Sequence, residues 1–271
     1  METRYQREFI NFQEHLKSFL FRLLINKADV EDVYQITYVK VHDKIDSFNN
    51  ESSFKTWVFS IALNTAKNLL HNQNRWHENA QDYAAKLHAQ SPKHLNLLKE
   101  TFASTPDEIY EIKEHISHCF NCITKTLELE QQICLWLKEV YDFKISEIME
   151  ISNLSEGKVK HALANARKNM IRIFDQRCAL VNKNGTCTQC TTLTGVLNQS
   201  QEAHIRYNKS KMARAALSDN QEHLLNLRVD LTKNVDPYNA PNSELNFFML
   251  ESMEGWVEEG KRKEMSKIRP K

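Results

Sequence analysis

Glycine and proline are scarce in this chain, whose 271 residues include only 5 of each. A large β-barrel or β-sandwich needs many tight turns, which these two residues commonly supply, so both folds are disfavoured. A chain of this length with 41% hydrophobic residues can still bury a core and form two domains of ordinary size. Helices are therefore the expected secondary structure.

Long apolar runs and a large net charge are also missing. No run approaches the roughly 18 residues of a membrane-spanning helix, and the N-terminal METRYQREFI lacks the apolar region of a signal peptide. The 36 basic and 35 acidic residues give a net charge of +1, so any contact with a polyanion must come from local patches. The sequence predicts a soluble, cytoplasmic protein.

Catalytic motifs are likewise absent from the sequence. It contains no nucleophile elbow, no phosphate-binding glycine loop and no paired acidic metal site. We therefore expect a protein without enzymatic activity.

Apolar residues at helical spacing predict a first helical domain over residues 1–75. Asp29 is the expected cap between the first two helices. A third helix follows the loop SFNNESS and is expected to be capped by Ser52 or Ser53. The stripes that would form the core of this domain are Phe9, Phe12, Leu16, Phe19, Leu20, Leu23 and Leu24; Val30, Val33, Tyr34, Thr37, Tyr38, Val41 and Ile45; and Trp57, Ile61, Ala62, Thr65 and Leu69.

Residues 76–108 are polar, rich in histidine and interrupted by Pro92 and Pro106, which is typical of a linker. Helical periodicity resumes at Ile109 and predicts a second domain over residues 109–177. The fold expected from the whole pattern is all-α, with two helical domains joined by a linker.

The end of the second domain has the pattern of a helix-turn-helix. A short helix over Ile145–Ile151, a turn over 152–155 and a longer helix from Glu156 are predicted. In the longer helix the spacing of Val159, Leu163, Ala166 and Met170 turns these residues inward, so Lys158, His161 and Asn165 point outward. Residues 155–177 contain six basic and two acidic residues. The second helix of such a motif enters the DNA major groove, although a helical hairpin with a solvated basic face would have the same pattern.

Two stretches of the chain together resemble one family. The segment "LELEQQICLWLKEVYDFKISEIMEI…SEGKVKHALANARKNM" is similar to the promoter-binding C-terminal domain of extracytoplasmic-function (ECF) sigma factors of bacterial RNA polymerase. The segment "DVEDVYQITYVKVHDKIDSF…SSFKTWVFSIALNTAKNLL" is similar to their N-terminal domain. The two segments follow the family's order across residues from about 5 to 177. The resemblance implies a sigma factor that binds core polymerase, recognises promoter DNA and supports duplex opening.

The resemblance also implies roles for individual residues. The helix over 29–45 would dock on the clamp helices of the polymerase's largest subunit through Asp32, Gln35, Val39 and Lys40. The loop and third helix would capture unstacked bases of the minus-ten element, and the helix from Glu156 would read the minus-thirty-five element. The implied DNA-binding residues are Asn50, Ser53, Phe54, Lys55, Trp57, Asn64, Lys67, Asn68, Lys158, Lys160, His161, Asn165, Arg167 and Lys168.

The cysteines predict a possible metal site in the second half of the chain. Cys119 and Cys122 form one C-x-x-C pair, and Cys187 and Cys190 form another. Four thiolates from two such pairs suit tetrahedral zinc. A redox dithiol and simple packing of buried thiols are the alternatives.

Residues 178–271 extend beyond the resemblance and are predicted to form helices over roughly 200–230 and 243–264. We expect this cysteine-containing extension to be regulatory. An anti-sigma factor or other regulator is a possible partner, in addition to core polymerase and promoter DNA. The alternatives to a sigma factor are a helix-turn-helix repressor that acts without polymerase and a zinc-dependent sensor or interaction module.

Overall fold

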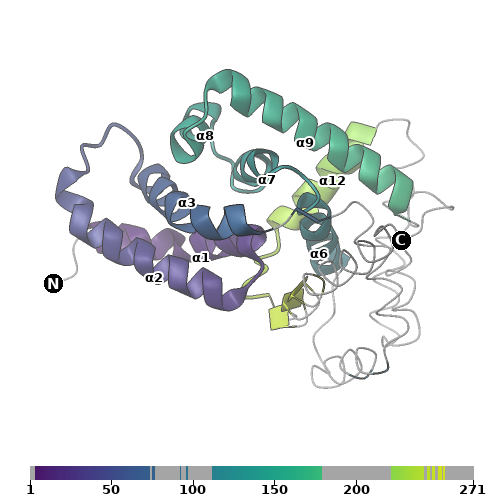
Figure 1. The fold of residues 1–271 in the computed structure, drawn as a ribbon, viewed down its shortest axis with the longest axis horizontal. Helices are drawn as coiled ribbons and strands as arrows, with labels where there is room; N and C mark the ends of the chain where they lie inside the picture. The colour runs from purple at the N-terminus through teal and green to yellow at the C-terminus, as the bar shows by residue number, and fades with distance from the viewer. Residues whose placement is uncertain are drawn as a thin grey trace, which may run out of the picture. The chain divides into compact units, whose positions relative to one another are not determined.

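The computed structural model describes residues 4–73, 75–76, 92, 96, 112–178 and 221–240, and part of 243–253. Within these residues the elements are helices, which confirms the predicted all-α fold (Figure 1). Contacts divide the chain into two compact units. The first is Met1–Arg75, Leu127–Lys168 and Asp236–Ala240, and the second is Trp76–Thr126, Asn169–Val235 and Pro241–Lys271. These units are defined by contacts and not by function. The predicted domain boundaries at residues 75, 108 and 177 therefore stay predictions.

The first unit begins with two helices, α1 (Arg4–Leu24) and α2 (Lys27–Lys44). The predicted apolar stripe of α1 is buried throughout. The predicted cap of α2 is wrong: Asn26 is the capping residue, and its side chain accepts a hydrogen bond from the Asp29 amide at 3.0 Å. Asp29 instead places a carboxylate in the first turn, where the positive end of the helix dipole favours it.

The third helix, α3 (Phe54–Asn72), follows the short 3₁₀ turn η1 (Ile45–Ser47). Its cap is Ser53, one of the two predicted candidates, because the Ser53 hydroxyl accepts from the Thr56 amide at 3.0 Å. The predicted buried face is displaced, since Trp57 and Ile61 are only half-buried. The reason is that α3 packs against α1, α2 and a later helix, α8, so that several sides are covered. Its buried side chains are Phe54, Thr56, Val58, Phe59, Ala62, Leu63, Ala66 and Leu70.

The predicted helix-turn-helix is confirmed. Helix α7 (Leu129–Leu135) continues into the π-helical turn η2 (Trp136–Val140), and the motif itself is α8 (Ile145–Ser152) followed by α9 (Glu156–Arg177). Asn153 ends α8 in the left-handed conformation, with φ 59°, which redirects the chain into α9. The predicted inward residues Val159, Ala166 and Met170 are fully buried.

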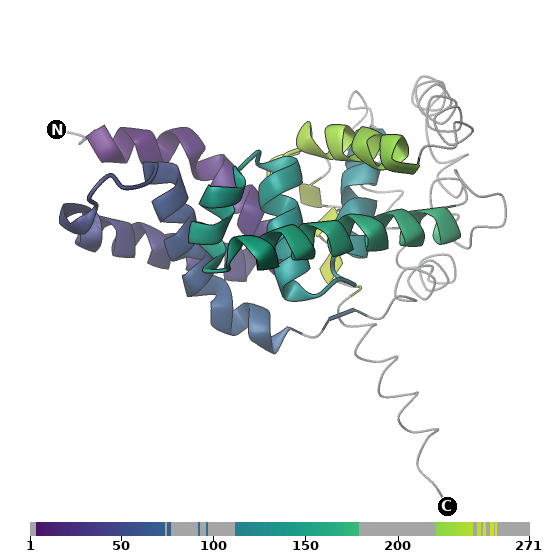
Figure 2. The same ribbon diagram turned by 90° about the horizontal axis from the view of Figure 1, so that it is seen from above.

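Helix α8 packs directly on α3 within the first unit (Figures 1 and 2). The ring of Phe143, just before α8, lies 5.0 Å from that of Phe59. The Thr56 hydroxyl donates to Glu147 Oε1 at 3.2 Å, and Glu147 Oε2 accepts from the Lys144 amide at 2.8 Å. One glutamate therefore both caps α8 and links it to α3.

A buried arginine joins α1 to the segment around η2. Arg22 is 1% exposed, and its guanidinium carbon lies 4.8 Å from the centre of the Trp136 ring. Arg22 Nε donates to the Tyr141 hydroxyl at 3.2 Å, and the same hydroxyl lies 2.8 Å from Ser18 Oγ. Burial raises the pKa of Tyr141, although the Arg22 charge and the hydrogen bonds from Ser18 and Arg22 oppose it, so this phenol stays neutral.

The second unit contains α6 (Ile112–Thr124), the C-terminal end of α9 and α12 (Gln221–Lys233). Ile116 of α6 packs against Leu227 and Leu231 of α12. The helix predicted over 200–230 is thus helical at 221–233, and its earlier part lies outside the described residues. Most of the predicted linker at 76–108 also lies outside them.

Replacing Tyr141 with Phe should destabilise the first unit, because it removes the hydroxyl that accepts from the buried Arg22. A buried donor that loses its partner costs about 1–3 kcal/mol. Urea unfolding followed by circular dichroism measures the change. The control is Tyr38→Phe, because Tyr38 is 40% exposed. Its free energy of unfolding should change by no more than about 0.5 kcal/mol. Equal effects of the two substitutions would contradict a structural role for the Tyr141 hydroxyl.

Candidate nucleic-acid and partner interfaces

The loop before α3 brings aromatic rings together. Phe48 lies 5.0 Å from Trp57 and 5.6 Å from Phe54, measured between ring centroids. Phe54 is 4% exposed, whereas Phe48 and Trp57 are half-buried. Sequence reasoning missed Phe48, although its position in SFNNESS between two helices was a usable signal. The half-exposed pair Phe48 and Trp57 offers ring surface on which a nucleic-acid base can stack.

Polar side chains continue this surface along α3. Asn64, Lys67 and Asn68 are exposed, and Lys67 Nζ donates to Asn64 Oδ1 at 3.2 Å. Asn50 is exposed in the loop with φ 60°. Ser53 is exposed, but its hydroxyl is engaged as the helix cap. The structure therefore places the polar side chains of Asn64, Lys67 and Asn68 on the solvent-exposed side of α3.

Lys55 has a different environment from the other predicted DNA-binding lysines. Its Nζ lies 4.8 Å from the centre of the Phe143 ring and 5.6 Å from that of Phe59. Burial lowers the pKa of Lys55, although the Glu147 and Asp142 charges act in the opposite direction. Lys55 is therefore half-buried against Phe143, in the loop that precedes α8.

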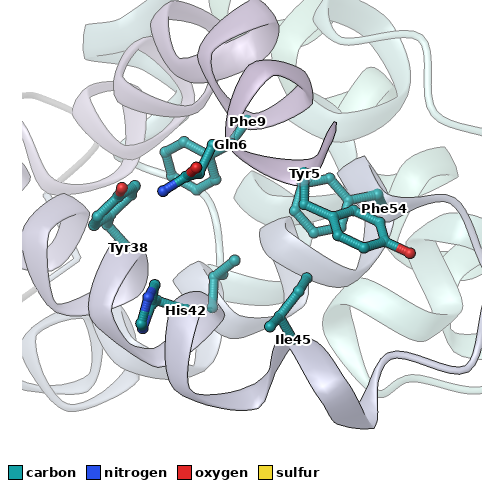
Figure 3. Close-up of a pocket in the computed structure, with 8 residues that line it drawn as sticks. Tyr5, Gln6, Phe9, Tyr38, His42, Ile45 and Phe54 are labelled. Carbon is teal, nitrogen blue, oxygen red and sulfur yellow. The ribbon is translucent and has the colours of Figure 1, made fainter. Parts of the chain in front are cut away.

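An apolar pocket of about 110 Å³ opens between α1, α2 and the start of α3 (Figure 3). Tyr5 and Phe54 lie side by side at one end, with ring centroids 5.1 Å apart. Gln6, His42 and the tyrosines Tyr5 and Tyr38 are the lining residues that carry polar groups. The pocket shares Phe54 with the aromatic cluster of the loop.

The outward side of α2 carries all of the predicted polymerase-binding residues. Asp32, Gln35, Val39 and Lys40 are exposed. Sequence reasoning missed Ile36, which is 47% exposed beside Val39 at 55%. Lys40 Nζ donates to the Thr65 hydroxyl of α3 at 3.0 Å. Adjacent apolar side chains on an otherwise polar helix surface are suited to a partner protein.

Helix α9 presents Lys158 and His161 outward, with the half-buried Asn165 beside them. The Asn165 amide nitrogen lies 3.2 Å from His161 Nε2. Two of the predicted basic residues have acidic partners: Lys160 pairs with Glu156 at 2.6 Å, and Arg167 with Glu139 at 2.7 Å. Lys168 is exposed.

The described cysteines divide into different environments. Cys122 Sγ lies 3.6 Å from His118 Nε2 and 3.5 Å from Met253 Sδ. Burial, with Glu130 as a lesser cause, raises the pKa of Cys134 to about 12, so this thiol stays protonated. Cys187 and Cys190 lie outside the described residues, so the zinc site stays a prediction. No cluster of metal-ligating side chains occurs in the parts of the chain that the structure describes.

Comparison with known proteins identifies the N-terminal helices. Residues 9–76 match the family model of sigma-70 region 2. The ECF RNA polymerase sigma-E factors of Salmonella typhimurium and Escherichia coli (strain K12) are each 30% identical over 159 residues, which cover 59% of this chain and 80% of each relative. The sigma-E factor of Haemophilus influenzae is 27% identical over 154 residues, which cover 53% and 74%.

A sigma-70 region 2 followed by a helix-turn-helix defines the class of proteins that give RNA polymerase its promoter specificity. The chain belongs to the ECF sigma factors of the sigma-70 family. It therefore recognises promoters and supports the initiation of transcription. This result confirms the predicted function over a repressor or a zinc-dependent module.

Within the described residues, no helix combines the length and the apolar character required to cross a bilayer.

The zinc site predicts one zinc ion per chain in protein purified under reducing conditions. Cys187→Ser should remove that zinc, because three thiolates bind the ion less tightly than four. Cys134→Ala is the control, since its protonated, buried thiol is not a ligand. Metal analysis by plasma mass spectrometry measures the stoichiometry, and a wild-type chain without stoichiometric zinc would refute the site.

Proposed function

We propose that the outward side of α2 binds core RNA polymerase. The observation that carries this proposal is the exposure of Ile36 and Val39 beside Asp32 and Gln35. Burial of two apolar side chains at the centre of an interface supplies affinity, and the surrounding polar groups fix the orientation of the partner.

We propose that the loop before α3 and the outward side of this helix capture the minus-ten element. Extrusion of a base from the duplex costs a few kcal/mol, which stacking on an aromatic ring offsets at about 1–3 kcal/mol per base. Phe48 and Trp57 provide such rings, and Asn64 and Lys67 provide polar contacts. The apolar pocket adjoins these rings, because Phe54, which lines it, lies 5.6 Å from Phe48 and 5.9 Å from Trp57 between ring centroids.

Helix α9 is proposed to read the minus-thirty-five element through Lys158, His161 and Asn165. A histidine and an amide on one helix surface can donate to and accept from base edges in the major groove. Lys168 would contact phosphate and set the salt dependence of binding. Arg167 and Lys160 would first have to leave Glu139 and Glu156.

Use of both sites on one promoter requires the first unit to open. The two promoter elements lie roughly 25 base pairs apart, or about 85 Å at about 3.4 Å per base pair. In the structure α3 and α8 are in contact, with Thr56 and Glu147 only 3.2 Å apart. We infer that this is a closed form, and that polymerase and DNA separate the helix-turn-helix from α3.

The protein is proposed to act in the cytoplasm without catalytic chemistry of its own. Regulation by an anti-sigma factor is a further proposal, since the exposed side of α2 could be covered by an inhibitor in place of polymerase. Run-off transcription with core polymerase on a promoter library tests the whole proposal. Failure to direct initiation from any promoter would refute it.

Ile36→Asp should weaken binding to core polymerase, because it places a charge at the centre of the proposed interface. Loss of about 2 kcal/mol, or about thirtyfold in Kd, is expected for a central apolar contact. The matched control is Ile10→Asp on α1, where the isoleucine is 48% exposed. Fluorescence titration with labelled core enzyme gives both values, and equal weakening by the two variants would contradict the assignment of the interface to α2.

His161→Ala should reduce discrimination at the minus-thirty-five element by about 1–3 kcal/mol, because a base contact is lost. Transcription from promoters mutated at single positions measures the discrimination. Gln176→Ala, an exposed position near the end of the same helix, is the control and should leave it unchanged. A uniform loss on all promoter sequences would instead assign His161 to the phosphate backbone.

A further inference from the structure

A short segment of the C-terminal extension packs with the N-terminal helices. Asp236–Ala240 belongs to the first unit, although the residues on both sides of it belong to the second. We call this segment the strap. It is far in sequence from α1 and α2, yet Tyr238 is only 8% exposed.

The strap is a turn organised by Asp236. Asp236 Oδ1 accepts from the Tyr238 amide at 2.9 Å, and Oδ2 accepts from Asn239 Nδ2 at 3.0 Å. The Ala240 amide donates to the Asp236 carbonyl at 2.9 Å. Pro237 fixes its own φ angle, so little conformational freedom is lost when the turn docks.

Tyr238 is held by residues of α1 and α2. Its hydroxyl donates to Glu31 Oε1, and its ring lies 5.5 Å from Lys17 Nζ and 5.8 Å from Lys27 Nζ. The Phe21 ring lies edge-on at 6.4 Å. A tyrosine ring close to two ammonium groups is stabilised by cation–π attraction. The tyrosine hydroxyl donates a hydrogen bond to the carboxylate.

Charged groups complete the docking surface. Lys17 Nζ donates to Glu31 Oε1 at 3.0 Å, and Asn239 Nδ2 donates to Glu14 Oε2. Burial alone would raise the pKa of Glu31, but the hydrogen bonds from Tyr238 and Lys17 and the charges of Lys17 and Lys27 outweigh it and lower the pKa. Glu31 is therefore ionised at neutral pH and accepts from the strap.

We propose that the strap is an intramolecular competitor of core RNA polymerase for α2. Glu31 precedes Asp32 in the chain and lies one turn before Gln35, so Tyr238 sits at the edge of the proposed polymerase-binding surface. A helix is about 10–12 Å across, so a partner helix on that surface would meet the docked strap. This inference rests on the polymerase interface proposed for α2.

The test is the affinity of full-length protein for core polymerase. Tyr238→Ala should bind about three- to tenfold more tightly, because a competing docked state lowers the apparent affinity by the fraction of molecules that are undocked. Tyr238→Phe removes only the hydroxyl and should shift Kd in the same direction by about twofold. Asn234→Ala is the control. The Asn234 side chain is exposed just before the strap and donates to the Asp230 carbonyl. The Kd of this variant should therefore equal that of the wild type.

Hydrogen exchange at the Tyr238 and Ala240 amides provides a second measurement. Exchange should be slow in the free protein and faster once polymerase is bound, because the strap has left α2. Unchanged Kd for both folded Tyr238 variants, with wild-type binding intact, would overturn the strap inference alone. Absence of binding by wild type and all variants would overturn the polymerase interface as well.

Discussion

The buried guanidinium of Arg22 is the constraint on which the first unit depends. A charge removed from water needs neighbours that replace its hydration, and Trp136 and Tyr141 provide a ring face and a hydroxyl. Both neighbours come from the segment that leads into the helix-turn-helix. Arg22 therefore links α1 to this segment, and α8, which follows it in the chain, packs on α3.

In this packing, α3 contacts both the core helices of the first unit and the helix-turn-helix. Its buried side forms the core with α1 and α2, and its N-terminal part holds α8 through Thr56 and Phe59. The same part of the chain follows the loop with Phe48 and carries Trp57, the two rings that are proposed to stack on bases of opened promoter DNA. In the proposed closed form, the helix-turn-helix is therefore held against α3 through α8. Opening requires the binding free energy of polymerase and DNA to exceed that of the contacts that hold α8 on α3.

Local patterns predicted much of the fold. The stripe from Phe9 to Leu24, the cap at Ser53 and the turn at Asn153 each depend on residues close in sequence, and each was found. The buried side of α3 was not predicted correctly, because α3 also packs on α8, and the Thr56–Glu147 contact between them joins residues 91 positions apart in the sequence. The contacts of Arg22, Lys55 and Tyr238 are also long-range, and helical periodicity contains no information about them.

For the candidate sites, residue type and position on the helix correctly predicted which side chains are exposed. They could not predict which other side chains these residues contact. Val39, Lys67 and His161 are exposed as expected, whereas Arg167 pairs with Glu139 and Phe54 is buried in the aromatic cluster. Phe48 was missed because it is a single apolar residue in a polar loop, where helical periodicity gives no signal, and Ile36 was missed because it lies outside the predicted apolar stripe of its helix. The exposure of Ile36 and the partial exposure of Phe48 became evident only in the structure.

Energy transfer between fluorophores on α3 and α8 tests the central claim most directly. Cysteines introduced at the exposed positions Asn72 and Glu150, in a chain whose native cysteines are replaced, allow the labels to be attached. We predict efficient transfer in the free protein and its loss in a transcriptionally active complex with core polymerase and promoter, where the two elements lie about 85 Å apart. Efficient transfer that persists in the active complex would contradict the account.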